Sequence, residues 1–175
     1  MQGKIALEEH LAIEATLGDS KVFGAHVWDT LHPRLFDVQE IRLREMDKHG
    51  IEMMILSLNA PAIQAIHDAN RAIEVAREAN DVCAEHMRKR PDRFQSFAAL
   101  PMQDPQAAAA ELTRCVKELG FVGALVNGFS QVGAPERFKE QQPLGRGGPV
   151  HWASFPPLHR CFTPKSVYKE PATNT

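Results

Sequence analysis

The sequence lacks several features that would place it in a whole class of proteins. A membrane-spanning helix needs about 18 apolar residues in a row, and no apolar run in the sequence approaches this length. The first residues also lack the basic and then apolar pattern that a secretory signal would show. The formal net charge is only −2, which gives no reason to expect a nucleic acid or an anionic membrane as partner. We therefore expect a cytoplasmic protein without nucleic-acid or membrane partners.

Cysteine is also scarce, with three in 175 residues. Cys83, Cys115 and Cys161 are too widely spaced to suggest a disulfide framework or a zinc knuckle. Cys83 and Cys115 fall on apolar faces of expected helices, which favours buried free thiols. No Ser or Cys lies in a G-x-S-x-G nucleophile motif, and no glycine-rich dinucleotide fingerprint follows the first expected strand.

Strand and helix patterns alternate over residues 3–128. Short apolar runs predict strands, and apolar residues at three- and four-residue steps predict helices. The expected strands are residues 4–8, 52–58, 94–100 and 121–126, and the expected helices are about 37–49, 68–89 and 104–119. A loop containing Gly18, Gly24 and Pro33 is expected between the first strand and the first helix. Strands joined by helical crossovers form a parallel sheet, so either a doubly wound sheet or part of a (β/α)₈ barrel fits.

Helix boundaries have recognisable signals in this chain. Asp37 and Asp104 are suitable N-caps, and Pro105 occupies a first-turn position that tolerates proline. Gly50 is suited to the left-handed residue that ends a helix, and Pro91 ends the longest helical pattern. These signals agree with the apolar periodicity between them.

The pattern changes after residue 130. Residues 131–175 contain seven of the twelve prolines and no aspartate, and their aromatic residues follow no period of 2 or 3.6. We expect an irregular segment, either disordered or produced by a shift of reading frame, in place of further βα units.

The first expected strand runs into two acids and a histidine, Glu8-Glu9-His10. Because alternate residues of a strand share a face, Glu8 and His10 are predicted to point the same way and Glu9 the opposite way. A carboxylate oxygen beside an imidazole nitrogen forms part of a divalent metal site. The alternative is a solvated strand end without a ligand.

Polar residues also follow the other strands, where parallel α/β folds place their sites. They include Ser57 and Asn59 at the end of the second strand and Asn127 after the fourth. Each has a simpler interpretation as a turn residue, so their convergence supports a pocket without assigning any of them to a ligand.

Several separate segments resemble the family of γ-resorcylate (2,6-dihydroxybenzoate) decarboxylases, a branch of the amidohydrolase superfamily. The matching segments are residues 1–10, 54–61, 91–94, 97–101 and 119–131. They occur in the same order and spacing as in the family, over about residues 1–131. The resemblance ends where the family continues into its fifth strand.

The resemblance implies a (β/α)₈ TIM barrel of the amidohydrolase type, about twice the length of this chain, of which residues 1–130 would form the first four βα units. It implies Glu8 and His10 as metal ligands on the first strand and Phe23 as a substrate-binding aromatic residue. The implied cofactor is a divalent metal, Zn²⁺ or Mn²⁺. A further histidine and an aspartate ligand, and other catalytic groups, belong to the family's second half and have no counterpart here.

The implied reaction is non-oxidative decarboxylation of an ortho-hydroxybenzoate, a small aromatic carboxylate, by a carboxy-lyase. The resemblance also implies that full-length relatives are homo-oligomers. Two alternatives stay open from the sequence: a metal-dependent hydrolase of the same superfamily, and a non-catalytic half-barrel. In all three cases an open half-barrel would expose sheet edges that are prone to aggregation.

Overall fold

The computed structural model describes residues 3–17, 25–127, 129–130, 142–143 and 150–154 of the 175. The first half contains β1 (Lys4–Leu11), α1 (Glu14–Leu17), α2 (Ala25–Phe36), α3 (Ile41–His49), β2 (Ile51–Leu58) and the short 3₁₀ helix η2 (Ala62–Ala65). The second half contains α4 (Ala69–Lys89), β3 (Phe94–Ala98), α5 (Pro105–Lys117), β4 (Gly123–Asn127), β5 (Phe129–Ser130), β6 (Gln142–Pro143) and β7 (Val150–Ser154).

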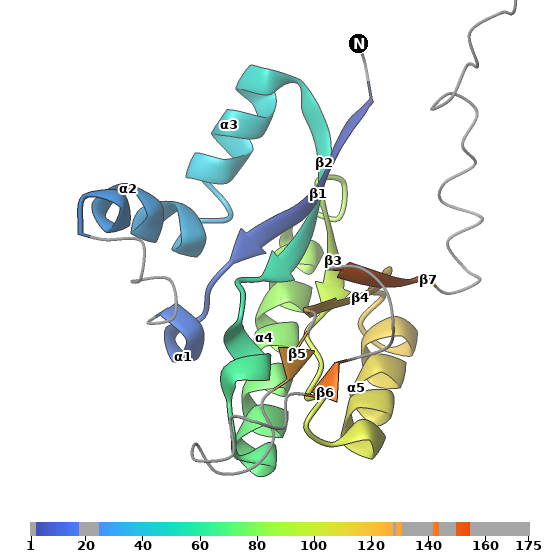
Figure 1. Ribbon diagram of the computed structural model, residues 1–175. Helices are drawn as coiled ribbons and strands as arrows, with labels where there is room; N and C mark the ends of the chain where they lie inside the picture. Colours follow the sequence, from blue (N-terminus) through green and yellow to red (C-terminus); the bar gives the residue numbers. More distant parts are fainter. Residues whose placement is uncertain (1–2, 18–24, 128, 131–141, 144–149, 155–175) are drawn as a thin grey trace, which may run out of the picture.

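Four parallel strands form the centre of the molecule (Figure 1). The sheet order is β1-β2-β3-β4-β7, with β7 antiparallel to β4. Helix α2 packs on β1, α3 on β2, α4 on β2 and β3, and α5 on β4. This arrangement confirms the expected parallel sheet with helical crossovers and is half of a (β/α)₈ barrel.

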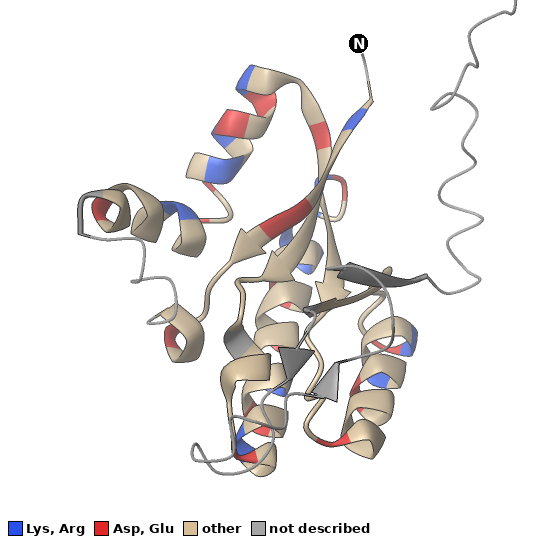
Figure 2. Cartoon of the chain, in the orientation of Figure 1, with Lys and Arg blue, Asp and Glu red and all other residues tan. Residues whose placement is uncertain are grey.

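The core lies between the sheet and the helices that follow β2 and β3. Strand β2 is buried from Met54 to Leu58, as the nearly continuous apolar run predicts for a strand covered on both faces. Phe94 at the start of β3 and Met46 of α3 are fully buried. Charged residues gather on the helices, with one acidic band toward the end of β1 (Figure 2). Within the described part of the chain, no helix combines the length and apolar character that crossing a bilayer requires.

Aspartate side chains lie at the starts of the helices, and Asp104 occupies the N-cap that the sequence predicted. The side chain of Asp68 accepts a hydrogen bond from Arg71 N at the start of α4, and Asp104 accepts from Gln106 N and Ala107 N at the start of α5. Asp37, the expected N-cap, lies one turn ahead of α3, whose N-cap is Glu40, and Asp37 Oδ1 accepts from the backbone nitrogens of Glu40 and Ile41. These acceptors satisfy backbone donors that have no partner within a helix.

The expectation of a loop between the first strand and residue 37 was wrong, because residues 25–36 form α2. Pro33 lies inside this helix, near its end. The rings of Trp28, His32 and Phe36 follow one another at four-residue steps, with centroids 5.3 and 5.5 Å apart. Contacts at this spacing support a helix, and this helix accommodates Pro33.

The segment that we expected to be irregular, residues 131–175, contains strands β6 and β7. Strand β7 pairs with β4 from Gly123↔Ser154 to Asn127↔Val150. An open edge of β4 would leave backbone donors and acceptors unpaired, and a passing extended segment satisfies them. The other residues of this segment lie outside the described part of the chain.

Candidate functional site

The ends of the parallel strands bring the predicted polar residues to one edge of the sheet. In the register of β1 and β2, His10 lies opposite Ser57 and Leu11 opposite Leu58. Strand β1 extends to Leu11, beyond the expected end at Glu8, so both acids and the histidine belong to the strand.

Glu8 lies at an irregularity of β1. Ala6 pairs with Met54 and Glu9 with Leu56, so three steps on β1 match two steps on β2. Glu8 has a φ of 60°, in the left-handed region that residues other than glycine rarely adopt. This is a β-bulge, a feature that redirects a side chain and occurs often beside active sites. Simple alternation does not apply across a bulge, so the shared face of Glu8 and His10 stays a prediction.

The imidazole of His10 is held by a buried hydroxyl. His10 Nδ1 lies 2.8 Å from Ser57 Oγ, and Ser57 is fully buried on β2. When Ser57 Oγ accepts a hydrogen bond from Nδ1–H, the lone pair of Nε2 is available to a metal ion, which is the arrangement that orients metal-binding histidines in proteins. Sequence reasoning noted Ser57 only as a turn residue.

The charge of His10 depends on opposing effects. Partial burial lowers the pKa of His10 below its usual value, the carboxylates of Glu8 and Glu9 act in the opposite direction, and Arg42 lowers it further. The net result favours the neutral imidazole, the form that binds metals.

The donor types of Glu8 and His10 fit a divalent cation, and they account for part of a coordination shell. Among the residues that the structure describes, no group of three or more His, Cys, Asp or Glu side chains could hold a metal ion. Catalytic zinc sites commonly use three protein ligands. Phe23, the predicted substrate-binding residue, and the side chain of Asn127 lie outside the described residues.

Asn59 has a structural role at this edge. Thr16 Oγ1 donates to Asn59 Oδ1 at 2.9 Å, and Asn59 Nδ2 donates to Thr16 O at 3.2 Å. Both residues are buried. Asn59 therefore ties α1 to the end of β2, which positions the segment that follows β1.

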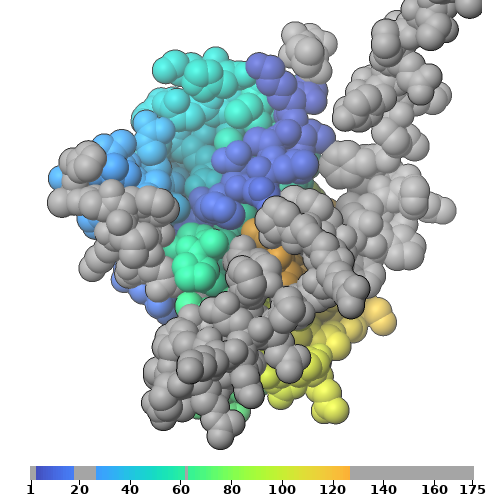
Figure 3. All heavy atoms as spheres, viewed as in Figure 1, coloured from blue at the N-terminus to red at the C-terminus, as the bar shows by residue number. Residues whose placement is uncertain are grey.

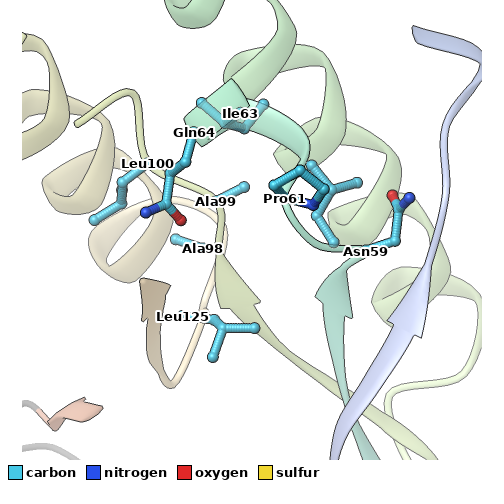
Figure 4. Close-up of a pocket in the computed structure, with 9 residues that line it drawn as sticks. Asn59, Pro61, Ile63, Gln64, Ala98, Ala99, Leu100 and Leu125 are labelled. Atoms are coloured by element: carbon cyan, nitrogen blue, oxygen red, sulfur yellow. The ribbon is translucent and has the colours of Figure 1, made fainter. Parts of the chain in front are cut away.

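A small cavity of about 20 Å³ lies between the ends of β2, β3 and β4 (Figure 4). Pro61 and Ile63, which follow β2, line it together with Ala98 at the end of β3, Leu100 after β3 and Leu125 of β4. Asn59 and Gln64 supply its polar lining. It lies at the carboxyl ends of the parallel strands, where such folds place their sites, and it has room for about one water molecule.

The two described cysteines are not candidates for a nucleophile. Cys83 and Cys115 are buried free thiols, as predicted. Burial raises the pKa of Cys83 to about 11, and burial likewise raises the pKa of Cys115. Both thiols are therefore protonated at neutral pH.

Comparison with known proteins is consistent with this geometry. Residues 23–144 match the family model described as Amidohydrolase. The chain belongs to the amidohydrolase family. It is 68% identical over 133 residues to the γ-resorcylate decarboxylase of Rhodococcus jostii, which covers 75% of this chain and 40% of that protein. It is 66% identical over 134 residues to the γ-resorcylate decarboxylase of a Rhizobium species, covering 76% of this chain and 41% of that protein.

Solved structures of amidohydrolase relatives match the fold. A dihydroxybenzoic acid decarboxylase from a Polaromonas species, with bound manganese and the inhibitor 2-nitroresorcinol, has a TM-score of 0.76 at 63% identity, over 81% of this chain and 42% of that one. A 2,6-dihydroxybenzoate decarboxylase complexed with 2,6-dihydroxybenzoate has a TM-score of 0.76 at 63% identity, over 82% of this chain and 43% of that one. This amidohydrolase chain thus spans about two fifths of the length of these relatives.

Proposed function

We propose that this chain supplies the N-terminal, metal-binding part of a decarboxylase that removes CO₂ from an ortho-hydroxybenzoate such as 2,6-dihydroxybenzoate. The observation that carries the proposal is the hydrogen bond between His10 Nδ1 and the buried Ser57 Oγ, on the strand that also carries Glu8. The identity of 66–68% to γ-resorcylate decarboxylases supports the reaction and the substrate class.

Glu8 would hold the metal through a carboxylate oxygen and His10 through Nε2. When bound, the divalent cation, Mn²⁺ or Zn²⁺, would supply positive charge that orients the carboxylate and ortho oxygen of the substrate and offsets their negative charge. Ser57 keeps the ring of His10 oriented. Manganese in the structure of the Polaromonas relative favours Mn²⁺ over Zn²⁺.

The same proposal extends to the complete protein. Further metal ligands and the group that protonates the ring carbon would come from a region equivalent to the remaining length of the relatives. We infer a cytoplasmic homo-oligomer for that protein. The 175-residue chain by itself is expected to bind Mn²⁺ weakly and to decarboxylate 2,6-dihydroxybenzoate little, because two protein ligands leave the site incomplete.

A titration of Mn²⁺ into the 175-residue chain, followed by the electron paramagnetic resonance of free Mn²⁺, tests the metal assignment. Glu8→Gln and His10→Asn should each abolish the weak binding. Glu9→Gln is the matched control, because it removes the same charge from the neighbouring position. Binding that survives both Glu8→Gln and His10→Asn would place the metal elsewhere.

A chimaera tests the reaction. Residues 1–130 of this chain are joined to the remaining part of the Rhodococcus jostii relative, and release of CO₂ from 2,6-dihydroxybenzoate is measured. The chimaera should be active, and Glu8→Gln within it should remove the activity.

A non-catalytic half-barrel is the second candidate, favoured by the absence of a three-ligand cluster among the described residues. A folded chimaera without CO₂ release would support that candidate. Hydrolysis of an ester or amide in place of CO₂ release would support the hydrolase alternative.

A further inference from the structure

Arg42 makes a contact with the end of β1 that the proposed function does not use. It lies in α3, and its Nη2 donates to the backbone oxygen of His10 at 2.6 Å and to that of Arg34 at 3.1 Å. A single guanidinium thus joins α3 to the candidate ligand strand and to the end of α2. Figure 1 places α2 and α3 together beside β1, away from β3 and β4.

The carbonyl that Arg42 contacts is one that the sheet does not use. Leu11 O accepts a hydrogen bond from Asn59 N, which follows β2. Consecutive carbonyls of a strand point to opposite sides, so the oxygen of His10 points away from β2. Among the described residues, no strand pairs with this outer edge of β1, and β1 lies at the surface there (Figure 3). Arg42 takes the place of a strand partner.

His10 is therefore held at two points from two different elements. Ser57 of β2 contacts the ring at Nδ1, and Arg42 of α3 contacts the main chain at the carbonyl oxygen. We propose that Arg42 is a positioning residue for His10: it fixes the backbone at the end of β1 so that the ring meets Ser57 and presents Nε2 to the metal. The part of this inference that concerns the metal rests on the proposed function.

The rival explanation is that Arg42 only fastens α2 and α3 to the sheet. Arg42 Nη1 is buried and has no hydrogen-bond partner among the described residues. A buried guanidinium nitrogen without a partner costs free energy. A side chain that served only to stabilise the packing of α2 and α3 on the sheet would be expected to have all its buried donors paired. The two explanations differ in what happens to the imidazole, because only a positioning role predicts a change in the ring of His10.

The tautomer of His10 in the metal-free chain is the first measurement. Two-bond ¹H–¹⁵N correlation spectra at a pH of about 8, above the ordinary histidine pKa, distinguish a protonated Nδ1 from a protonated Nε2. We expect a protonated Nδ1 in the unaltered chain. Arg42→Gln should shift the ring toward a mixture of tautomers. Ser57→Ala should do the same, because it removes the group that contacts Nδ1 itself. Arg44→Gln, an exposed arginine two positions away in the same helix, should leave the tautomer unchanged.

Mn²⁺ affinity is the second measurement. Arg42→Gln should weaken binding about 10-fold relative to Arg44→Gln, the size of effect expected when a group that orients a metal ligand is lost. An unchanged tautomer or an unchanged affinity in Arg42→Gln would overturn the positioning role. If the unaltered chain does not bind Mn²⁺, the proposed function fails, whereas the tautomer result still decides whether Arg42 positions the ring.

Loss of Arg42 can also impair folding, so two further tests are included. Arg42→Lys keeps the charge on a shorter side chain with a different donor geometry, and it should give an intermediate tautomer shift in a folded chain. In the unaltered chain, scalar coupling across the hydrogen bond should connect Arg42 Nη2 to the carbonyl carbon of His10. Its absence in a well-resolved spectrum would overturn the inference without any substitution.

Discussion

The buried polar groups between α4, β3 and α5 are arranged differently from those at the end of β1. Asn80 of α4 donates to Ala99 O and Glu111 Oε1, and it accepts from Ala99 N. Arg114 then donates to both carboxylate oxygens of Glu111 and to Asp81. In this cluster, which we call the Asn80 network, each side chain has hydrogen-bond partners on α4, on α5 or directly after β3.

The end of β1 departs from regular strand geometry. Glu8 has a left-handed backbone, the ladder to β2 is interrupted, and Arg42 keeps a buried nitrogen without a partner among the described residues. Strain of this kind persists only where the surroundings enforce it, and it gathers at functional sites. We infer that the Asn80 network serves the stability of the fold, and we propose that the irregular backbone at the end of β1 serves the geometry of the candidate metal ligands.

The largest effect is expected from removing Asn80. Asn80→Ala would leave Ala99 N and Ala99 O unpaired in the core, and we expect the free energy of unfolding to fall by about 4 kcal/mol. Urea denaturation measures this, with Asn70→Ala, exposed in the same helix, as control. A loss no larger than that of the control would show that the network is dispensable.

Loss of Arg114 should come next and should change the pH dependence of stability. Burial alone would raise the pKa of Glu111, but its hydrogen bonds to Arg114 and Asn80 lower the pKa below the ordinary value of 4.5. A lowered pKa means that Glu111 stabilises the fold above pH 4.5 and that this contribution is lost as the pH falls below it. Arg114→Gln should cost about 2 kcal/mol at pH 7.

The unfolding free energy at acid pH provides the control for the Arg114→Gln prediction. As the pH falls below 4.5, the difference in unfolding free energy between Arg114→Gln and the unaltered chain should shrink. Thermal unfolding at a series of pH values measures it. A difference that stays constant down to the acid transition would mean that the ion pair to Glu111 does not carry the effect.

Ser57→Ala should affect metal binding more than stability. We expect Mn²⁺ affinity to fall about 10-fold, because the ring of His10 loses the partner that orients it. Ser96→Ala is the matched control, since Ser96 is equally buried but donates to Leu56 O. Equal losses of affinity in the two variants would assign the effect to general loosening of β2 and β3.

Much of the fold follows from local sequence signals. Helix α4 was predicted because apolar periodicity agreed with the stop at Pro91, and helix α5 because it agreed with the cap Asp104. Helix α2 was missed because the segment with Gly18, Gly24 and Pro33 was interpreted as a loop. Strand β7 was missed because its pairing depends on the open edge of β4, which no pattern within residues 150–154 reveals.

The candidate metal ligands could be predicted from the sequence, whereas the residues that hold His10 in place could not. Glu8 and His10 were found by their spacing and by the resemblance. Ser57 and Arg42 lie 47 and 32 residues from His10 along the chain, so only the packing of β1 against β2 and α3 brings them together. The bulge at Glu8 has the same origin, because an extra residue can be recognised only by counting both strands.

The smallest effects should have opposite signs at two adjacent positions. Glu8→Gly should raise the free energy of unfolding by about 1 kcal/mol, because glycine adopts a φ of 60° without the strain that a Cβ atom imposes. Glu9→Gly should lower it by about 1 kcal/mol, since Glu9 has regular strand pairing with Leu56. Urea denaturation compares the two variants, which change the charge equally. Mn²⁺ binding should be lost in Glu8→Gly and kept in Glu9→Gly, so the more stable variant would be the one without a site. If Glu8→Gly were as destabilising as Glu9→Gly, the left-handed backbone would carry no strain, and the contrast with the Asn80 network would rest on Arg42 and the interrupted ladder alone.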